Sequence, residues 1–266
     1  KKKTLNSNEK ILLLLGCCRI SYLCFSWLYH FLSIIYPNYL YIHPILQLLA
    51  SFSTFFNYSN LWVSACLCVF YCIKIADFRN RFFIYLKVKI DRIVPWLLLG
   101  SGILALAIGI VIYDLTETVQ SYNLSSTCLG SFWEANIKMD KYFYPFFLTG
   151  FGYAASFTAV ILSAVFLLFS LWRHKCKMQT NSTNSFSMDA HIRAMKSILS
   201  FLVMYSINFV CLILTIIYSM TNENTKTLLI STYFCAYPGV HSLILIFSNP
   251  KLEKALLKIL SCVKCE

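Results

Sequence analysis

The sequence predicts an all-α protein that lies within a membrane, and three observations support this fold class. Hydrophobic residues make up 58% of the 266 residues and charged residues only 13%, a balance untypical of a water-soluble domain. Six apolar segments are long enough to cross a bilayer as helices. Lysine and arginine are concentrated in every second segment between these spans, as is typical of cytoplasmic loops. The predicted spans are residues 11–35, 44–73, 93–112, 145–172, 198–220 and 228–249, in one transmembrane domain over residues 1–266.

The positive charges also predict the orientation of the chain. Of the 23 lysines and arginines, four precede the first span, six separate the second and third, five separate the fourth and fifth, and four follow the last, whereas the opposite breaks hold three. This bias places the amino end, both basic loops and the tail 250–266 in the cytoplasm. The net charge of +12 therefore reports topology and attraction to membrane lipids, and we expect no nucleic-acid partner.

The polar chemistry of the chain predicts neither an enzyme nor a metal site. Most of the 12 cysteines lie in the spans, where a thiol behaves as a small hydrophobe, and no histidine is spaced with them as a ligand. No nucleophile elbow or pair of carboxylates lies in the spans, so we expect no catalysis and no cofactor. Cys262 and Cys265 in the tail are either palmitoylated or free thiols.

The first span contains Arg19, well inside its apolar run. A guanidinium at this depth costs roughly 3 kcal/mol or more on insertion scales, so it should face protein or water. We expect carbonyls or hydroxyls of a neighbouring helix as its partners, and snorkelling to the cytoplasmic end is the alternative. No apolar segment precedes the opening basic run, which indicates a chain truncated at its amino end.

The second span carries a sparse polar stripe. Its members, spaced by four, three and four residues, share one helix face and should look into a bundle, because polar groups are costly against lipid. Interhelical hydrogen bonding explains them, and the alternative is that Asn57 and Asn60 help to line a ligand cavity. The stripe comprises Ser53, Asn57, Asn60 and Ser64.

The breaks around the third span carry two further signals. The basic loop 77–92 mixes aromatic with basic residues, which suits a helix on the inner membrane surface or a surface for a cytosolic partner. The long outer loop 113–144 contains the sequon Asn123-Leu124-Ser125, so we expect N-glycosylation at Asn123. The same pattern at Asn181 lies in a predicted cytoplasmic loop and should stay unmodified.

The last three spans contain isolated polar or aromatic candidates. Phe151 belongs to an aromatic-rich fourth span that follows Pro145, and either packing or a cavity explains it. A polar loop, 173–189, follows this span, and Asn208 in the fifth should face the bundle. In the sixth, Tyr237-Pro238-Gly239 should break the helix before His241 and Ser242; His241 is expected to be a packing residue in preference to a metal ligand or proton relay.

Three separated blocks resemble the vertebrate bitter taste receptors. They stand, in order, where that family has the end of its third helix, the start of its sixth and its seventh. The resemblance implies a seven-transmembrane-helix receptor bundle, of which this chain holds six helices, the second to the seventh. Rhodopsin-like Asp/Glu-Arg-Tyr and Asn-Pro-x-x-Tyr motifs are absent, which also fits the family. The blocks are Leu61–Phe78 with Phe70-Tyr71-x-x-Lys74-Ile75-Ala76-x-Phe78, His191-x-x-Ala194-x-Lys196-x-x-x-Ser200-Phe201-Leu202-x-x-Tyr205, and Tyr237-Pro238-x-x-His241-Ser242-x-x-Leu245-Ile246-x-x-Asn249.

The resemblance implies a G protein-coupled receptor of the plasma membrane that detects bitter small molecules. Its pocket would lie in the outer half of the bundle, and its partner would be a gustducin-type heterotrimeric G protein, with a receptor dimer left open. Asn57 aligns with a pocket position that is commonly Asn, Ser53 stands where many members have Trp, and Ser231 aligns with a ligand-contacting position of the seventh helix. Further candidates for ligand contact are Asn60, Phe151 and Asn208.

The same resemblance implies residues that switch the bundle or face the G protein. Arg19 corresponds to the arginine of the family's second helix. The remaining candidates lie at the inner ends of the spans: Tyr71, Lys74, Asp77, His191, Lys196, His241 and Ser242.

A six-span transporter or channel with both termini in the cytoplasm is the alternative. It is disfavoured because the sequence shows no inverted repeat and no filter-like loop, and its only deep charge is Arg19.

Overall fold

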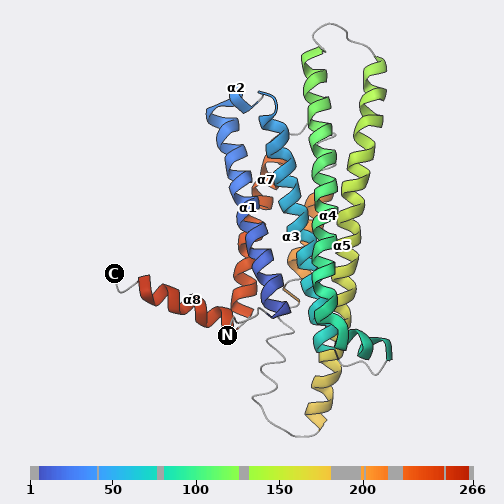
Figure 1. Ribbon diagram of the computed structural model, residues 1–266, viewed down its shortest axis with the longest axis vertical. Helices are drawn as coiled ribbons and strands as arrows, with labels where there is room; N and C mark the ends of the chain where they lie inside the picture. Colours follow the sequence, from blue (N-terminus) through green and yellow to red (C-terminus); the bar gives the residue numbers. More distant parts are fainter. Residues whose placement is uncertain are drawn as a thin grey trace. The chain divides into compact units, whose positions relative to one another are not determined.

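The computed structural model describes residues 6–40, 42–76, 81–125, 132–180, 199–200, 202–214, 224–248 and 250–263, and within them every regular element is a helix (Figure 1). Leu202–Leu214 forms a further apolar helix between α5 and α7. The predicted all-α class is therefore confirmed for this part of the chain. The labelled helices are α1 (Ser7–Ile35), α2 (Pro37–Leu40), α3 (Ile45–Ile75), α4 (Arg81–Ser125), α5 (Phe132–Thr180), α7 (Asn224–Ser248) and α8 (Pro250–Val263).

Four helices are long and apolar enough to cross a membrane: Ser7–Ile35, Ile45–Ile75, Phe83–Thr118 and Gly150–Arg173. They coincide with the first four predicted spans. The last two spans coincide with shorter apolar helices, Leu202–Leu214 and Ala236–Phe247, so the count of six stays a prediction.

The chain folds as two compact units. The first consists of Lys1–Phe70 and Val88–Ser156 and therefore holds α1, α2, most of α3 and α4, and α5 as far as Ser156. The second consists of Tyr71–Lys87 and Phe157–Glu266 and includes α7 and α8.

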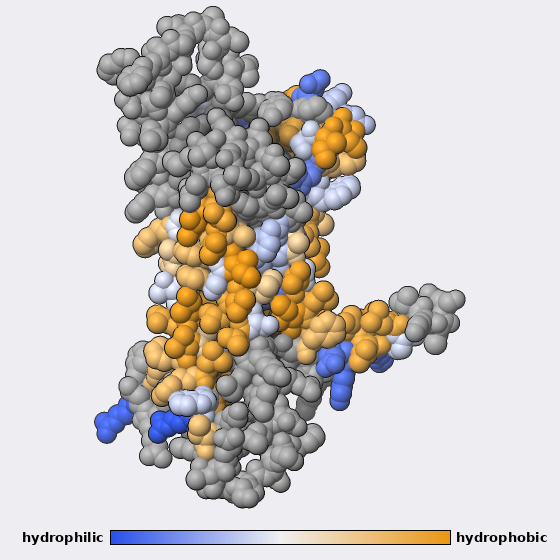
Figure 2. All heavy atoms as spheres, turned by 180° about the vertical axis from the view of Figure 1, so that it is seen from behind, coloured by the Kyte–Doolittle hydropathy of each residue, from blue (hydrophilic) through white to orange (hydrophobic). Residues whose placement is uncertain are grey.

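Helix α3 has the largest share of buried residues among the four long apolar helices. In its most apolar stretch 67% of the residues are buried, against 28% in α1 and 22% in Phe83–Thr118. The outward faces of α1 and α4 are apolar, with Trp27, Trp96 and Ile103 among their exposed side chains. Figure 2 shows orange, apolar atoms over much of the described part of the face that it presents. Such faces suit contact with lipid, while α3 carries the polar groups that need protein partners.

A capping box starts α1 four residues before the predicted span. The Asn6 side chain accepts a hydrogen bond from the Ser7 backbone, and the Asn6 backbone donates to Oε2 of Glu9 at 3.1 Å. These bonds satisfy amide groups that a helix start leaves without partners, so the helix begins in the polar segment.

Helices continue beyond the apolar runs into three predicted loops. The predicted loops 113–144 and 173–189 are therefore wrong at their ends, whereas a helix within 77–92 was one of the two interpretations of that segment. Helix α4 begins at Arg81 inside the predicted loop 77–92 and ends at Ser125 inside the predicted loop 113–144. Helix α5 begins at Phe132 and ends at Thr180, so it also covers the start of the predicted polar loop 173–189. A helix satisfies its own backbone groups and need not end where the hydrocarbon ends.

The predicted break at Tyr237-Pro238-Gly239 is also wrong, since α7 runs through it without interruption. Proline removes one backbone donor, a loss that a membrane helix tolerates when the neighbouring groups are satisfied. Ser242 Oγ donates to the Pro238 carbonyl at 2.7 Å and adds a local bond at this point.

Helix α8 ends the described chain as a short amphipathic helix that the sequence pattern did not predict. It exposes Leu257, Ile259 and Leu260 and also carries Lys254 and Lys258. Apolar and basic side chains on one exposed helix suit the surface of an anionic membrane.

Candidate functional site

Helix α1 places Arg19 against α3 inside the first unit. Its Nε donates to Oδ1 of Asn60 at 3.0 Å, and each residue is only 4% exposed. Arg19 therefore faces protein, as predicted, and does not snorkel to a helix end. A charged donor in a dry interior interacts strongly with a fixed acceptor, so this bond ties α1 to α3.

The next polar group of the stripe, Asn57, binds a different helix. Its Nδ2 donates to the hydroxyl of Tyr153 in α5 at 2.7 Å. The buried Tyr153 ring also packs edge to face against Tyr58, with centroids 5.0 Å apart. A buried tyrosine hydroxyl normally finds a partner, and here that partner fixes the orientation of the Asn57 amide.

The polar stripe therefore faces the bundle, as predicted. Asn57 and Asn60 bond to two different helices, Ser64 is buried, and Ser53 is half-buried. Interhelical hydrogen bonding, one of the two explanations given for the stripe, is confirmed for both asparagines. A role in ligand contact remains a prediction.

Close contact between α3 and α4 depends on a glycine that the sequence pattern did not single out. Ser51 Oγ donates to the carbonyl of Gly109 at 2.8 Å. A Cβ on Gly109 would lie 3.4 Å from the Ser51 carbonyl oxygen and 3.5 Å from Cβ of Phe55. Small residues let membrane helices approach in this way, and the glycine in an apolar span was the available signal.

A second glycine, Gly152, lies beside the Tyr58–Tyr153 pair. A Cβ at this position would lie 3.3 Å from the Tyr58 ring and 3.7 Å from the Ile108 side chain. The small residue therefore gives Tyr58 room to pack against Tyr153, the residue that binds Asn57.

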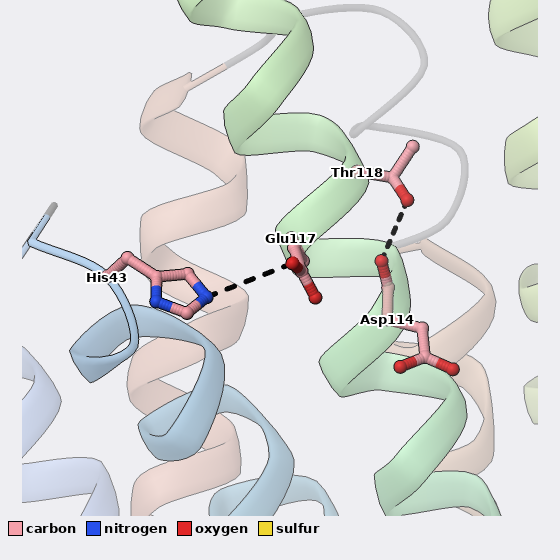
Figure 3. A network of polar contacts seen from close by, with 4 residues as sticks. All are labelled: His43, Asp114, Glu117 and Thr118. Carbon is pink, nitrogen blue, oxygen red and sulfur yellow. Dashed lines mark hydrogen bonds and ion pairs between the residues drawn. The ribbon is translucent and has the colours of Figure 1, made fainter.

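An exposed contact joins the segment before α3 to the far part of α4. His43 Nε2 lies 3.9 Å from Oε1 of Glu117, and their side chains are 58% and 51% exposed. Figure 3 shows His43 and Glu117 directed toward each other, with Thr118 donating to the Asp114 carbonyl one turn away at 2.8 Å. Water screens such a pair, so its energetic contribution is small.

We expect Glu117→Gln to change the free energy of unfolding by less than about 0.5 kcal/mol, because exposed ion pairs are worth little. A thermal unfolding measurement of the purified variant should give a melting temperature within about 2 °C of the parent protein. A larger fall would show that this contact fixes the packing of α4.

In the second unit, α5 packs on the helix Leu202–Leu214 through aromatic rings. Phe157 stacks on Phe209 with centroids 4.2 Å apart, and Tyr205 lies 6.3 Å from Phe157. Asn208 is buried, as predicted, and its Oδ1 makes no hydrogen bond with the described part of the chain. Its carbonyl could therefore accept a hydrogen bond from a ligand.

The remaining candidates occupy varied surroundings. Phe151 is 64% exposed, which favours a lipid-facing position over a ligand contact. At the end of α3, Tyr71 is half-buried and Lys74 exposed. His241 is buried against Tyr237, at a centroid distance of 5.7 Å, which agrees with packing.

Some predictions lie outside the described residues. These are the roles given to Asp77, His191 and Lys196, and those that depend on the side chains of Ser231, Asn123, Cys262 and Cys265.

Comparison of the sequence with known proteins finds similarity to one family of receptors. A family model described as taste receptor protein (TAS2R) matches residues 1–264. Taste receptor type 2 member 10 of Pan troglodytes is 31% identical over 241 residues, covering 88% of this chain and 76% of its own length. The Homo sapiens member 10 is 30% identical over 238 residues with the same coverage. Taste receptor type 2 member 7 of Macaca mulatta is 29% identical, covering 98% of this chain and 83% of its own.

Proposed function

The chain belongs to the taste receptor (TAS2R) family of bitter taste receptors, and we propose that it binds bitter small molecules within its bundle and activates a gustducin-type heterotrimeric G protein. Family membership makes it a multi-pass membrane receptor and not an enzyme. In the proposed topology the basic loops and the tail face the cytoplasm, and the Asn123 segment faces outward in the plasma membrane.

The hydrogen bond from Asn57 to Tyr153 is the observation that best supports a ligand site in the first unit. Asn57 is half-buried on the helix with the most buried residues, and its amide is held by the tyrosine. An amide fixed in this way is a preorganised hydrogen-bonding group, which small-molecule sites use to orient largely apolar ligands. Ser53, one turn from Asn57, would extend this surface, while Asn60 is engaged by Arg19.

In the second unit, the proposed ligand contacts are Asn208, with its buried carbonyl, and Ser231 of α7. Agonist binding would favour one arrangement of the helices and expose the inner surface to the G protein. The proposed switch residue within the bundle is Arg19. The other proposed switch and coupling residues lie toward the inner ends of the spans: Tyr71, Lys74, Asp77, His191, Lys196, His241 and Ser242.

Replacing Asn57 by alanine should raise the half-maximal concentration of a bitter agonist about tenfold, because one hydrogen bond in a water-poor site is worth about 1.4 kcal/mol. Tyr153→Phe should raise it less, because it removes only the group that orients the amide. The measurement is a calcium-mobilisation assay with a panel of bitter compounds, in cells that co-express a gustducin-type α subunit and the gene product containing this chain.

Phe151→Leu is the matched control, since this exposed residue lies two positions from Tyr153 in the same helix. Its response should equal that of the parent receptor at equal surface expression. Loss of response in the Phe151 variant, with Asn57→Ala unchanged, would place the ligand elsewhere. Activation only with a different class of G protein would reject the proposed coupling.

The proposed topology predicts a glycan at Asn123. Treatment with an N-glycosidase should increase the gel mobility of the receptor, and Asn123→Gln should abolish this shift, because the glycosylation machinery acts on the outward side. Asn181→Gln is the control and should leave the shift intact. A shift that depended on Asn181 would invert the proposed orientation.

A further inference from the structure

A largely apolar groove lies between α1, α3 and α4, all within the first unit. Its volume is about 400 Å³, which is in the range of sites for small molecules. Phe55 and Phe56 of α3 form part of its wall, and its α4 side includes Leu99 and Ile103. The last two side chains are more than half exposed, so the groove opens on the lipid-facing surface of α4.

One polar atom in this groove has no partner among the described residues. Ser59 lines the groove and is 5% exposed, and its Oγ makes no hydrogen bond with any of them. Another serine of the groove, Ser101, already donates to the Leu98 carbonyl at 2.8 Å. A buried hydroxyl without a partner is costly, and a ligand that supplies one recovers that cost.

The groove is separate from the polar stripe. At 100° per residue, Phe55, Ser59 and Val63 lie on a face of α3 roughly two-fifths of a turn from Asn57 and Ser64. Occupancy of the groove therefore does not require displacement of the Asn57–Tyr153 bond. The groove does border the α1–α3 contact, because Cys18, next to Arg19, lines it.

We propose that this groove is a second binding site, which takes small, neutral, mainly apolar molecules with one hydrogen-bonding group directly from the bilayer. No lining side chain is charged, so the occupant is neutral. The opening lies among exposed apolar side chains, so access is from lipid. The Ser59 hydroxyl is covered in this structure, and a rotation of its side chain would offer it to an alcohol or carbonyl compound, whereas a plain acyl chain would leave it unsatisfied. This proposal does not depend on whether the molecule that occupies the groove is a bitter agonist.

Photolabelling of the purified chain in lipid nanodiscs with a diazirine derivative of octanol tests the proposal. This probe is a small apolar alcohol, and mass spectrometry of the digested protein locates its adducts. We expect saturable labelling of α1, α3 and α4 peptides that line the groove, with displacement by excess octanol. Labelling that grows in proportion to probe concentration over all lipid-facing helices would overturn the proposal, because it would report partition into the bilayer only.

Two glycines of α4 provide a matched pair of variants. A Cβ added at Gly102 or at Gly100 would meet no atom within 4 Å, but only Gly102 lines the groove. Gly102→Leu should therefore fill the groove and reduce labelling at least tenfold, whereas Gly100→Leu should leave it unchanged. Equal labelling of the two variants would overturn the proposal.

Ser59→Ala tests the role of the hydroxyl without adding volume. We expect saturation to need a roughly fivefold higher probe concentration, the equivalent of one net hydrogen bond. Unchanged saturation in this variant, with labelling still lost in Gly102→Leu, would reject the alcohol-selective site and leave a groove filled by any lipid chain. Thermal unfolding of each variant confirms that it is folded.

Discussion

Replacing Asn60 by leucine is expected to lower the free energy of unfolding by about 3 kcal/mol. The change removes the acceptor that lies 3.0 Å from Arg19 Nε and leaves the guanidinium in a site where it is only 4% exposed. A hydrogen bond that involves a charged group contributes about 1.5–3 kcal/mol, and the upper end of this range applies because both residues are buried. Leucine keeps the branched shape and the number of side-chain heavy atoms of asparagine, so the substitution opens no cavity at this buried position.

The melting temperature measures this effect. For a chain of this size, about 3 kcal/mol corresponds to a fall of roughly 5–10 °C. A thiol-reactive dye can follow unfolding in detergent, because Cys18, Cys68 and Cys72 are buried free cysteines.

Arg19→Met separates loss of charge from loss of contact. Methionine keeps much of the arginine stem and leaves only a neutral amide at Asn60, so this variant should lose less stability than Asn60→Leu. The double variant should then be no less stable than Asn60→Leu alone. The two single variants could instead lose the same stability, with the loss in the double variant equal to the sum of the two. The bond would then carry no coupling energy, and the inference that it ties α1 to α3 would be wrong.

The burial of the polar stripe could be predicted from sequence because hydrocarbon penalises polar groups strongly. A helical period and the cost of polar atoms in lipid suffice to turn Asn57 and Asn60 inward, and the same cost turns Arg19 toward protein. The partners could not be predicted in this way. Tyr153 is one of many aromatic residues in its span, and only three-dimensional packing brings its hydroxyl within 2.7 Å of Asn57.

Helix ends were less predictable than spans for a related physical reason. Hydropathy reports where lipid contact ends, whereas the helix ends where its backbone loses hydrogen bonds. Polar residues such as Lys87, Lys89 and Glu117 are compatible with a helix in water, so α4 continues through both predicted loop borders. Pro238 likewise removes one bond from α7 without ending it.

The glycines at helix contacts could not be predicted from the sequence either, because a hydropathy pattern does not distinguish them from other glycines. Gly100, Gly102 and Gly109 all stand in the apolar part of α4, yet among these three only Gly109 would bring an added Cβ within 4 Å of other atoms. Which of these positions needs a small residue depends on where α3 lies. The three glycines therefore differ in the substitutions that they tolerate.

Gly109→Leu should lower the free energy of unfolding by about 3 kcal/mol, the upper end of the usual cost of overpacking. Its Cβ would lie 3.4 Å from a backbone oxygen of Ser51, and the further side-chain atoms would have to displace α3. That displacement also breaks the 2.8 Å bond from Ser51 Oγ to the Gly109 carbonyl. The melting temperature should fall by roughly 5–10 °C.

Gly100→Leu is the control for Gly109→Leu, since both exchange glycine for a better helix former in the same helix. At position 100 the new side chain meets open space, so the melting temperature should stay constant or rise slightly. Ser51→Ala removes the hydrogen bond alone and should cost only about 1 kcal/mol. A fall in Gly109→Leu no larger than that of Ser51→Ala would mean that α3 and α4 can separate at little cost, and the close contact at Gly109 would then not be what fixes their spacing.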